Sequence, residues 1–181
     1  MSETQVYQET IRTPLWLRLL LLGLVGGSVA ALAFCRGAGP STEPLLTWSL
    51  GLIALATLVV TLLLAMLFGR LSLSANGGEL VVHFGYLPLL CKKISFDDIA
   101  SAKAVRYRPI QHFSGWGIRW GRYQGVRTAL YALRGSKGVL LVLHHPIETH
   151  LLKTDHIIVG SQDPLQLAEY LLPRIRRTER T

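Results

Sequence analysis

The sequence predicts a membrane α-hairpin followed by a mainly β soluble domain, and three observations indicate this fold class. Hydrophobic residues make up 50% of the 181 residues and charged residues only 17%. The apolar residues are concentrated in two long runs near the N-terminus. Sixteen of the 19 Lys and Arg residues, and all six His residues, follow Gly69, where short alternating segments begin. We therefore expect three parts: an N-terminal segment (1–14), two transmembrane helices with a short turn (15–68), and a soluble domain with a basic C-terminal tail (69–181).

Two apolar runs, 15–35 and 45–68, are each long enough for a transmembrane helix, which needs about 20 residues. A helix satisfies its own backbone hydrogen bonds within lipid. Arg18 lies near the start of the first run, where its side chain can extend to the headgroups. The connection 36–44 is short and contains Gly and Pro, so it predicts a tight turn. A stripe of small residues either packs closely against the second helix or is merely tolerated in lipid; it comprises Gly23, Gly26, Gly27 and Ala30.

The charges that flank the two helices predict that both termini and the soluble domain are cytoplasmic. Arg12 and Arg18 lie on the N-terminal side, and Arg70 follows the second helix. The turn carries only Arg36 and Glu43. Positive residues favour the cytoplasmic side of a membrane. An alternative is cleavage, because Ala31-Leu-Ala33 resembles a signal-peptidase site.

The region after Gly69 alternates between apolar and polar residues, as strands do. Short strands at near-regular spacing predict a barrel or a sandwich. The turn-forming Ala75-Asn-Gly-Gly78 predicts a hairpin between the first two strands. The expected strands are 71–74, 79–84, 93–97, 102–106, 117–119, 128–131, 138–143 and 156–159.

A single helix is predicted after the strands. Asp163 is a good N-cap, Pro164 occupies the first helical position, and Gln166 completes a capping box. One apolar stripe is expected to pack against the sheet; it comprises Leu165, Ala168, Leu172 and Ile175.

Four segments of the soluble domain resemble a known protein family. They are Gly115-Trp-Gly-Ile-Arg119, Thr128–Tyr131, Gly138–Leu143 and Ile158–Pro164. Together with the two-helix anchor, they resemble the bacterial pleckstrin-homology-like domains that occur beside transmembrane hairpins, over residues 70–175. The resemblance implies a pleckstrin-homology-like barrel capped by a C-terminal α-helix, in the bacterial inner membrane. It also implies an accessory or scaffolding role. The hairpin turn 75–78 carries no basic residue, so phosphoinositide binding is not carried over.

No enzyme motif is present: the sequence has no phosphate-binding glycine loop, no Gly-x-Ser-x-Gly and no His-Glu-x-x-His. Adjacent Asp97 and Asp98 would point to opposite faces of a strand, which is poor geometry for a shared acid/base site. We therefore expect a non-enzymatic protein without a cofactor or metal.

Cys35 and Cys91 are predicted on opposite sides of the membrane, where they cannot pair. The remaining metal candidates have a spacing that fits no zinc pattern; they are His144, His145, Glu148, His150 and His156.

Arginine and aromatic residues alternate over the segment 106–123. This mixture suits a protein interface or anionic lipid headgroups. Single-stranded nucleic acid would suit it too, but membrane anchoring argues against that partner. Within the segment we expect Arg108, Trp120 and Arg122 to be exposed binding residues, and Trp116 to belong to the core or, as an alternative, to the same contact surface.

The functional expectation is that the soluble domain docks on a partner, a larger membrane protein complex that it helps to assemble or stabilise. The lipid bilayer is the other expected partner. The alternative is an anionic-lipid sensor that uses the same basic segment.

Overall fold

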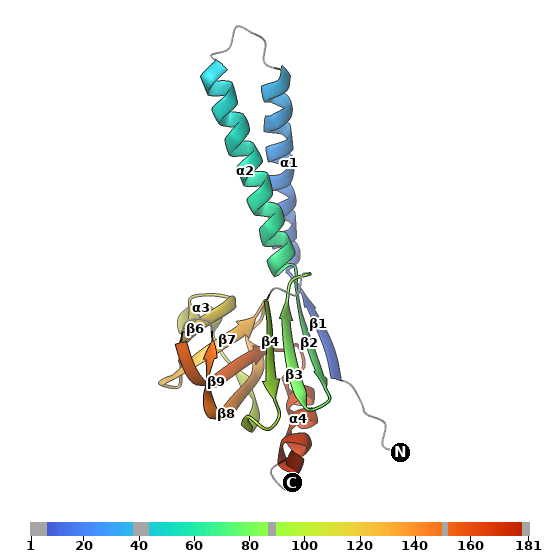
Figure 1. Ribbon diagram of the computed structural model, residues 1–181, viewed down its shortest axis with the longest axis vertical. Helices are drawn as coiled ribbons and strands as arrows, with labels where there is room; N and C mark the ends of the chain where they lie inside the picture. The colour runs from blue at the N-terminus through green and yellow to red at the C-terminus, as the bar shows by residue number, and fades with distance from the viewer. Residues whose placement is uncertain (1–6, 38–43, 87–89, 150–151, 179–181) are drawn as a thin grey trace.

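The computed structural model describes residues 7–37, 44–86, 90–149 and 152–178. A two-helix hairpin stands on a β-rich domain (Figure 1). In chain order the elements are β1 (Tyr7–Arg12), α1 (Leu15–Gly37), α2 (Pro44–Phe68), β2 (Arg70–Asn76), β3 (Glu79–Phe84), β4 (Leu90–Ser95), β5 (Ile99–Arg106), α3 (Pro109–Phe113), β6 (Gly117–Tyr123), β7 (Val126–Ala132), β8 (Lys137–Thr149), β9 (Leu152–Gly160) and α4 (Pro164–Thr178).

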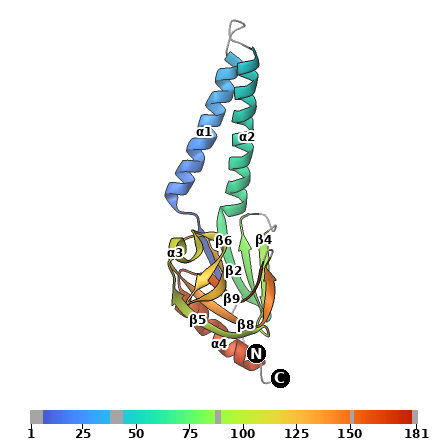
Figure 2. The ribbon, with the colours of Figure 1, turned by 90° about the vertical axis from the view of Figure 1, so that its left-hand side faces the viewer.

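Helices α1 and α2 confirm the predicted apolar hairpin. Both are long and apolar enough to cross a membrane, and only 6% and 11% of their most apolar windows are buried. The core helix of a soluble protein would be mostly buried, whereas these helices extend away from the domain (Figures 1 and 2). Their exposed leucine, valine and isoleucine side chains would be costly in water. A lipid environment therefore fits both helices.

The glycine stripe of α1 does not pack closely against α2, which corrects one expectation. A Cβ atom added at Gly23, Gly26 or Gly27 would meet nothing within 4 Å. Gly23 and Gly27 instead line a hollow of about 360 Å³ between the two helices. Among the described residues of these two helices, the buried side chains are Ser28 in α1, and Ala54 and Thr61 in α2.

The segment before the first helix belongs to the soluble domain. Residues 7–12 form β1, which pairs antiparallel with β2 in the register Tyr7↔Ala75 to Arg12↔Arg70. Thr13 N–H extends this contact by donating to the carbonyl of Gly69 (3.4 Å). The apolar two-helix hairpin is therefore a long insertion between two neighbouring strands. Cleavage after α1 would remove β1 from its sheet.

The strands form two sheets, and every predicted strand is present. The first sheet has the order β1-β2-β3-β4, and the second has the order β5-β8-β9-β7-β6. All pairs are antiparallel except β7–β9, which is parallel. Among the described residues, β1 and β4 are edge strands of one sheet, and β5 and β6 are edge strands of the other, so hydrogen bonding closes neither sheet into the expected barrel.

The main core lies between the two sheets, and α4 packs against it. The cap of this helix is confirmed, because Gln166 N–H donates to Asp163 Oδ1 (3.1 Å). The predicted stripe is confirmed at Ala168 and Ile175 and wrong at the other two positions, because Leu165 is 65% exposed and Leu172 only partly buried. The residues of α4 that enter the core are Leu167, Ala168, Leu171 and Ile175.

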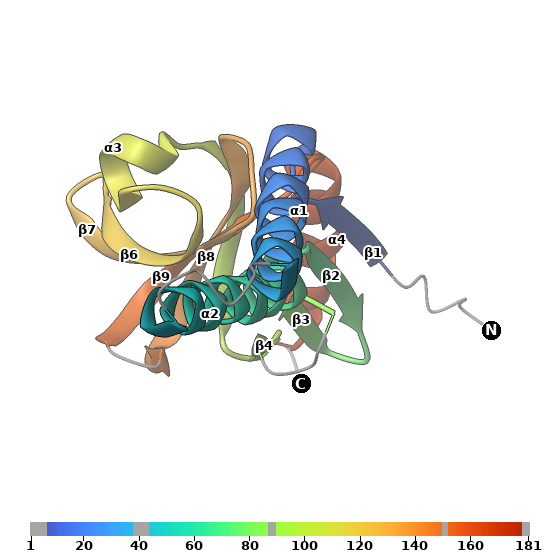
Figure 3. The same cartoon turned by 90° about the horizontal axis from the view of Figure 1, so that it is seen from above.

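A second, smaller core lies on the other face of the five-stranded sheet, which curls around it beneath α3 (Figure 3). Helix α3 lies very close to β6, since a Cβ atom at Gly121 would stand 2.8 Å from the ring of Phe113. The buried members of this cluster are Tyr107, Phe113, Tyr123, Leu130, Ala132 and Ile158.

The hydroxyl of Tyr107 has no hydrogen-bond partner among the described residues, although it is fully buried. Burial raises the pKa of this hydroxyl, so the folded state favours its protonated form. Folding stability is therefore independent of this group below the unfolded tyrosine pKa of about 10, and it falls as the pH rises from there toward the folded pKa. Burial also raises the pKa of Tyr131, to about 12.

We expect Tyr107→Phe to leave the neutral-pH stability unchanged or higher, because the substitution removes a buried polar group without a partner. Above pH 10 the variant should lose less stability than the parent chain. Denaturant unfolding at pH 7 and pH 10.5 measures both effects. A marked loss of stability at pH 7 would show that the hydroxyl has a partner in solution.

The end of α2 is fixed to the first sheet by the residues that follow β3. Tyr86 N–H donates to the carbonyl of Met66 in the last turn of α2 (2.9 Å), and Gly85 N–H donates to that of Arg70 (2.7 Å). Gly85 has φ +80°, and a Cβ atom there would lie 2.6 Å from the carbonyl oxygen of Leu67. Only glycine permits this approach. Together with the β1–β2 ladder, these contacts fix the domain to the roots of both helices.

Candidate functional site

The five-stranded sheet carries a strongly basic surface. No Asp or Glu occurs from Ile99 to Ile147, whereas eight Lys and Arg residues do. All eight are exposed, and they come from β5, β6, β7, the start of β8 and the connections between these strands. A surface with one sign of charge raises the local concentration of oppositely charged partners. The residues are Lys103, Arg106, Arg108, Arg119, Arg122, Arg127, Arg134 and Lys137.

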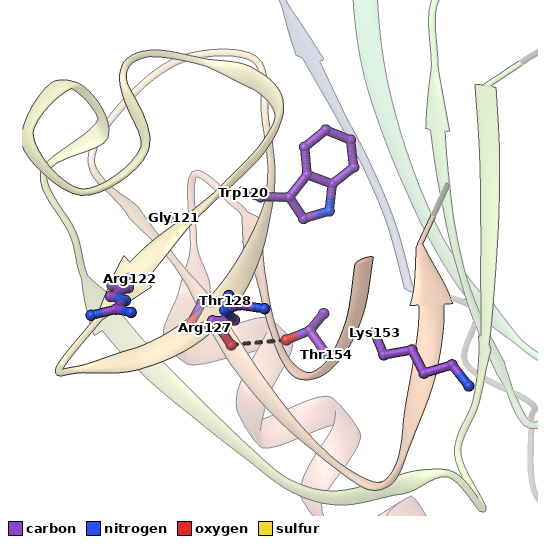
Figure 4. Close-up of a pocket in the computed structure, with 7 residues that line it drawn as sticks. All are labelled: Trp120, Gly121, Arg122, Arg127, Thr128, Lys153 and Thr154. Carbon is purple, nitrogen blue, oxygen red and sulfur yellow. Dashed lines mark hydrogen bonds between the residues drawn. The ribbon is translucent and has the colours of Figure 1, made fainter. Parts of the chain in front are cut away.

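An open pocket of about 220 Å³ lies within this surface, beside the β6–β7 hairpin (Figure 4). Strand β6 contributes Trp120 and Arg122, β7 contributes Arg127, and β9 contributes Lys153. Thr154 of β9 joins the two walls, because its Oγ1 donates to the carbonyl of Arg127 (2.8 Å). The pocket thus combines one large aromatic ring with three cationic side chains. Gly121 and Thr128 complete its lining.

Two of these cations, Arg122 and Arg127, are directly opposite each other in the β6–β7 register. Like charges in this position destabilise an antiparallel pair. An anion bound between them would relieve the repulsion, and arginine can hold a carboxylate through two parallel hydrogen bonds. The turn that brings them together contains Gln124 and Gly125, both at positive φ. The arrangement favours a carboxylate or phosphate ligand.

Trp120 is only partly buried, and it packs against the main core while lining the pocket. The sequence predicted an exposed side chain. Because Trp120 is on β6 two residues before Arg122, the two side chains share one face of the strand. Its ring therefore forms an apolar part of the pocket wall.

The third expected binding residue, Arg108, lies elsewhere and does not line the pocket. It is exposed at the start of α3, where its Nη1 donates to Gln111 Oε1 (3.0 Å). Trp116 was expected in the core, but it is 41% exposed. Its Nε1 donates to the carbonyl of Gly135 (2.9 Å), which holds the indole on the surface. The basic-aromatic segment therefore contributes to two separate surfaces.

Sequence reasoning missed Arg127 and Lys153 as members of the pocket. Arg127 could have been found, because the Gln124-Gly125 turn sets the register of a short hairpin and pairs it with Arg122. Lys153 reaches the pocket through the parallel β7–β9 pairing, which has no local signal. In the register of β8 and β9, Lys153 lies opposite Glu148.

The histidine-rich stretch lies on β8 and β9, near this pocket in sequence. His144 and His145 are exposed, and Nδ1 of His156 lies 2.9 Å from Asp155 Oδ1. That hydrogen bond lowers the pKa of the Asp155 carboxyl. Within the part of the chain that the structure describes, no three His, Cys, Asp or Glu side chains converge as metal ligands. His150 lies outside the described residues.

Comparison with known proteins leaves the chain without a family assignment. No protein-family model matches it, and a search of curated proteins finds no match.

Proposed function

We propose that this chain is a non-enzymatic, membrane-anchored accessory protein whose β domain docks on an acidic segment of a partner in a larger membrane complex. The register pair Arg122 and Arg127, both of which line the pocket, carries the proposal. Carboxylates of the partner would lie between these guanidinium groups, and an apolar side chain would pack on Trp120. Tryptophan and arginine are the residue types that dominate protein docking sites.

The pleckstrin-homology-like assignment is part of this proposal. Two packed β-sheets with a C-terminal helix against their common core support it. The parallel β7–β9 pair and the additional strand β1 distinguish the domain from the simple barrel that the sequence predicted. The docking experiment does not test this fold assignment.

Charge reversal at the pocket tests the docking. The double variant R122E/R127E changes two exposed side chains and leaves Trp120, which packs on the core, in place. Opposite charges at two interface arginines should lower recovery of the partner by about 30-fold or more, since each such residue contributes 1–2 kcal/mol or more. Cross-linked complexes of the full chain, purified in mild detergent and quantified by mass spectrometry, provide the measurement.

The matched control is K103E/R106E, two exposed cations on β5 with the same total charge change. Recovery of a stoichiometric partner with the parent and this control, but not with R122E/R127E, supports docking. Equal recovery with both double variants contradicts it. If R122E/R127E keeps the partner and loses only its preference for anionic vesicles, the chain is an anionic-lipid sensor.

The proposed orientation places both termini and the β domain in the cytoplasm. Arg12, Arg18 and Arg70 at the roots of the helices support it. Single cysteines at Gly37 and Leu165, in a chain with Cys35 and Cys91 replaced by Ser, report the two sides. An impermeant thiol reagent added to intact cells should label position 37 and not position 165. The reverse pattern would invert the topology.

A further inference from the structure

Helix α3 lies at the end of the β domain nearest the membrane hairpin. Figures 1 and 2 show it just beyond the level at which α1 begins and α2 ends, and Figure 3, viewed from the hairpin side, shows it uncovered beside the helices. In chain order it separates β5 from β6, which are the two edge strands of the five-stranded sheet. Its outer surface therefore faces the plane from which the helices rise.

The packing of α3 leaves an apolar residue on that outer surface. Pro109 and Phe113 are buried, and the Phe113 ring meets Tyr107 edge-on at 6.1 Å between centroids. Ile110, on the same helix, is 69% exposed. In water, an isoleucine in this state gives no stabilisation. The Ile110 side chain can become buried only against another molecule or another part of the chain.

Trp116, three residues after α3, adds a second exposed apolar group. Its indole N–H already donates to Gly135, so the exposed ring keeps its hydrogen bond when it leaves water. Tryptophan with an apolar body and a satisfied N–H is typical of the interface between lipid and water. Ser114 N–H donates to the carbonyl of Ile110 (3.1 Å), which holds the connection between the two residues in one turn.

Positively charged residues flank these two apolar residues in the chain. Arg108 and Arg119 are exposed on either side, and Arg119 Nε donates to the carbonyl of Trp116 (3.3 Å). No acidic residue occurs in the sequence between Asp98 and Glu148. Exposed apolar side chains set among arginines match the headgroup layer of an anionic leaflet.

We propose that α3 and Trp116 form a third membrane contact, with Ile110 and Trp116 in the headgroup layer of the leaflet that α1 and α2 enter. The contact rests on the membrane crossing of these helices and not on the docking pocket. The β1–β2 ladder and the Tyr86–Met66 hydrogen bond keep the domain from swinging away from the bilayer. The occupant of this surface is therefore anionic lipid, and the contact fixes the height and rotation of the domain on the membrane.

The experiment places a fluorescent NBD group on Ile110→Cys in the full chain, with Cys35 and Cys91 replaced by Ser. The protein is reconstituted at low density into vesicles of three parts phosphatidylcholine to one part phosphatidylglycerol. A nitroxide attached to the lipid headgroup or to the upper acyl chain serves as the quencher. The matched control is Leu165→Cys, where the native side chain is also apolar and is 65% exposed. Leu165 lies on α4, the helix that extends to the end of the domain opposite the hairpin (Figure 1).

We expect a blue-shifted emission at position 110 and several-fold stronger quenching there than at position 165. The further change R108E/R119E should reduce the quenching at position 110, because it removes the attraction to the anionic leaflet. Equal, weak quenching at positions 110 and 165 would overturn the proposal. Blue-shifted emission at position 110 without lipid quenching would overturn it too, because a protein surface would then cover Ile110.

Discussion

Replacing Leu171 with Asp is expected to unfold the β domain while leaving the membrane hairpin inserted. Leu171 is fully buried where α4 packs on the main core. An unpaired carboxylate in such a site costs several kcal/mol, which is comparable with the whole stability of a small domain, about 5–15 kcal/mol. Near-ultraviolet circular dichroism of the full chain in detergent, followed through a thermal scan, should show no cooperative transition.

Leu165→Asp is the matched control, since Leu165 lies on the same helix and is 65% exposed. Its transition should match that of the parent chain. The pair of variants also determines the helix phase. If L165D unfolds the domain and L171D does not, α4 packs through the stripe that the sequence predicted, and the described core is wrong.

Replacing Glu9 with Ala is expected to lower the free energy of unfolding by about 3 kcal/mol, from the loss of hydrogen bonds to a charged group. The Glu9 carboxylate accepts hydrogen bonds from Ser161 Oγ (2.6 Å), Gln162 N–H (2.6 Å) and Tyr7 Oη (2.8 Å). The bonds from Ser161 and Gln162 join β1 to the turn that leads from β9 into α4. Ser161 is itself buried, so the substitution leaves a buried hydroxyl without this acceptor.

Denaturant unfolding of the full chain in detergent measures this loss. The neighbouring Thr10→Ala is the control, because Thr10 is exposed on the opposite face of β1. Glu9→Gln should lie between the two, since its amide keeps an acceptor but loses the charge. A Glu9→Ala variant as stable as Thr10→Ala would show that β1 is not held against the β9–α4 turn.

Local patterns predicted most of the fold. Uninterrupted apolar length identified α1 and α2, and alternation located eight of the strands, because burial of one face is recorded along the strand itself. Strand β1 was missed because its core-facing positions include the charged Glu9, whose partners lie about 150 residues away. The parallel β7–β9 pair was missed for a similar reason: its register is a tertiary property.

The phase of α4 shows where local patterning becomes ambiguous. The helix is apolar at positions 164, 165, 167, 168, 171, 172 and 175, so more than one stripe has helical spacing. Contact with the sheets selects the stripe that includes Leu167 and Leu171. Sequence alone gives no basis for that choice.

The candidate site was predicted by residue type more successfully than by position. Trp120 and Arg122 do share a pocket, but Arg108 lies beside α3. Trp116 and Trp120 exchanged their expected environments, because the amphipathic indole fits both a core edge and a surface. Pairing with neighbouring strands decides which side chains of a strand are exposed, and a single sequence does not specify that pairing.

The central claim is that the membrane hairpin rises out of the β1–β2 ladder, so that the domain is mounted rigidly and presents α3 and the Trp120 pocket in fixed positions. Cysteines at Thr10 and Ser72, which are register partners, test this most directly in a chain with Cys35 and Cys91 replaced by Ser. A short bis-methanethiosulfonate cross-linker should join them efficiently in membranes, as detected by mass spectrometry of the linked peptides. Cysteines at Thr10 and Lys93, on the two opposite edge strands, should not be joined. Absence of the 10–72 product, or equal yields from both pairs, would contradict the account.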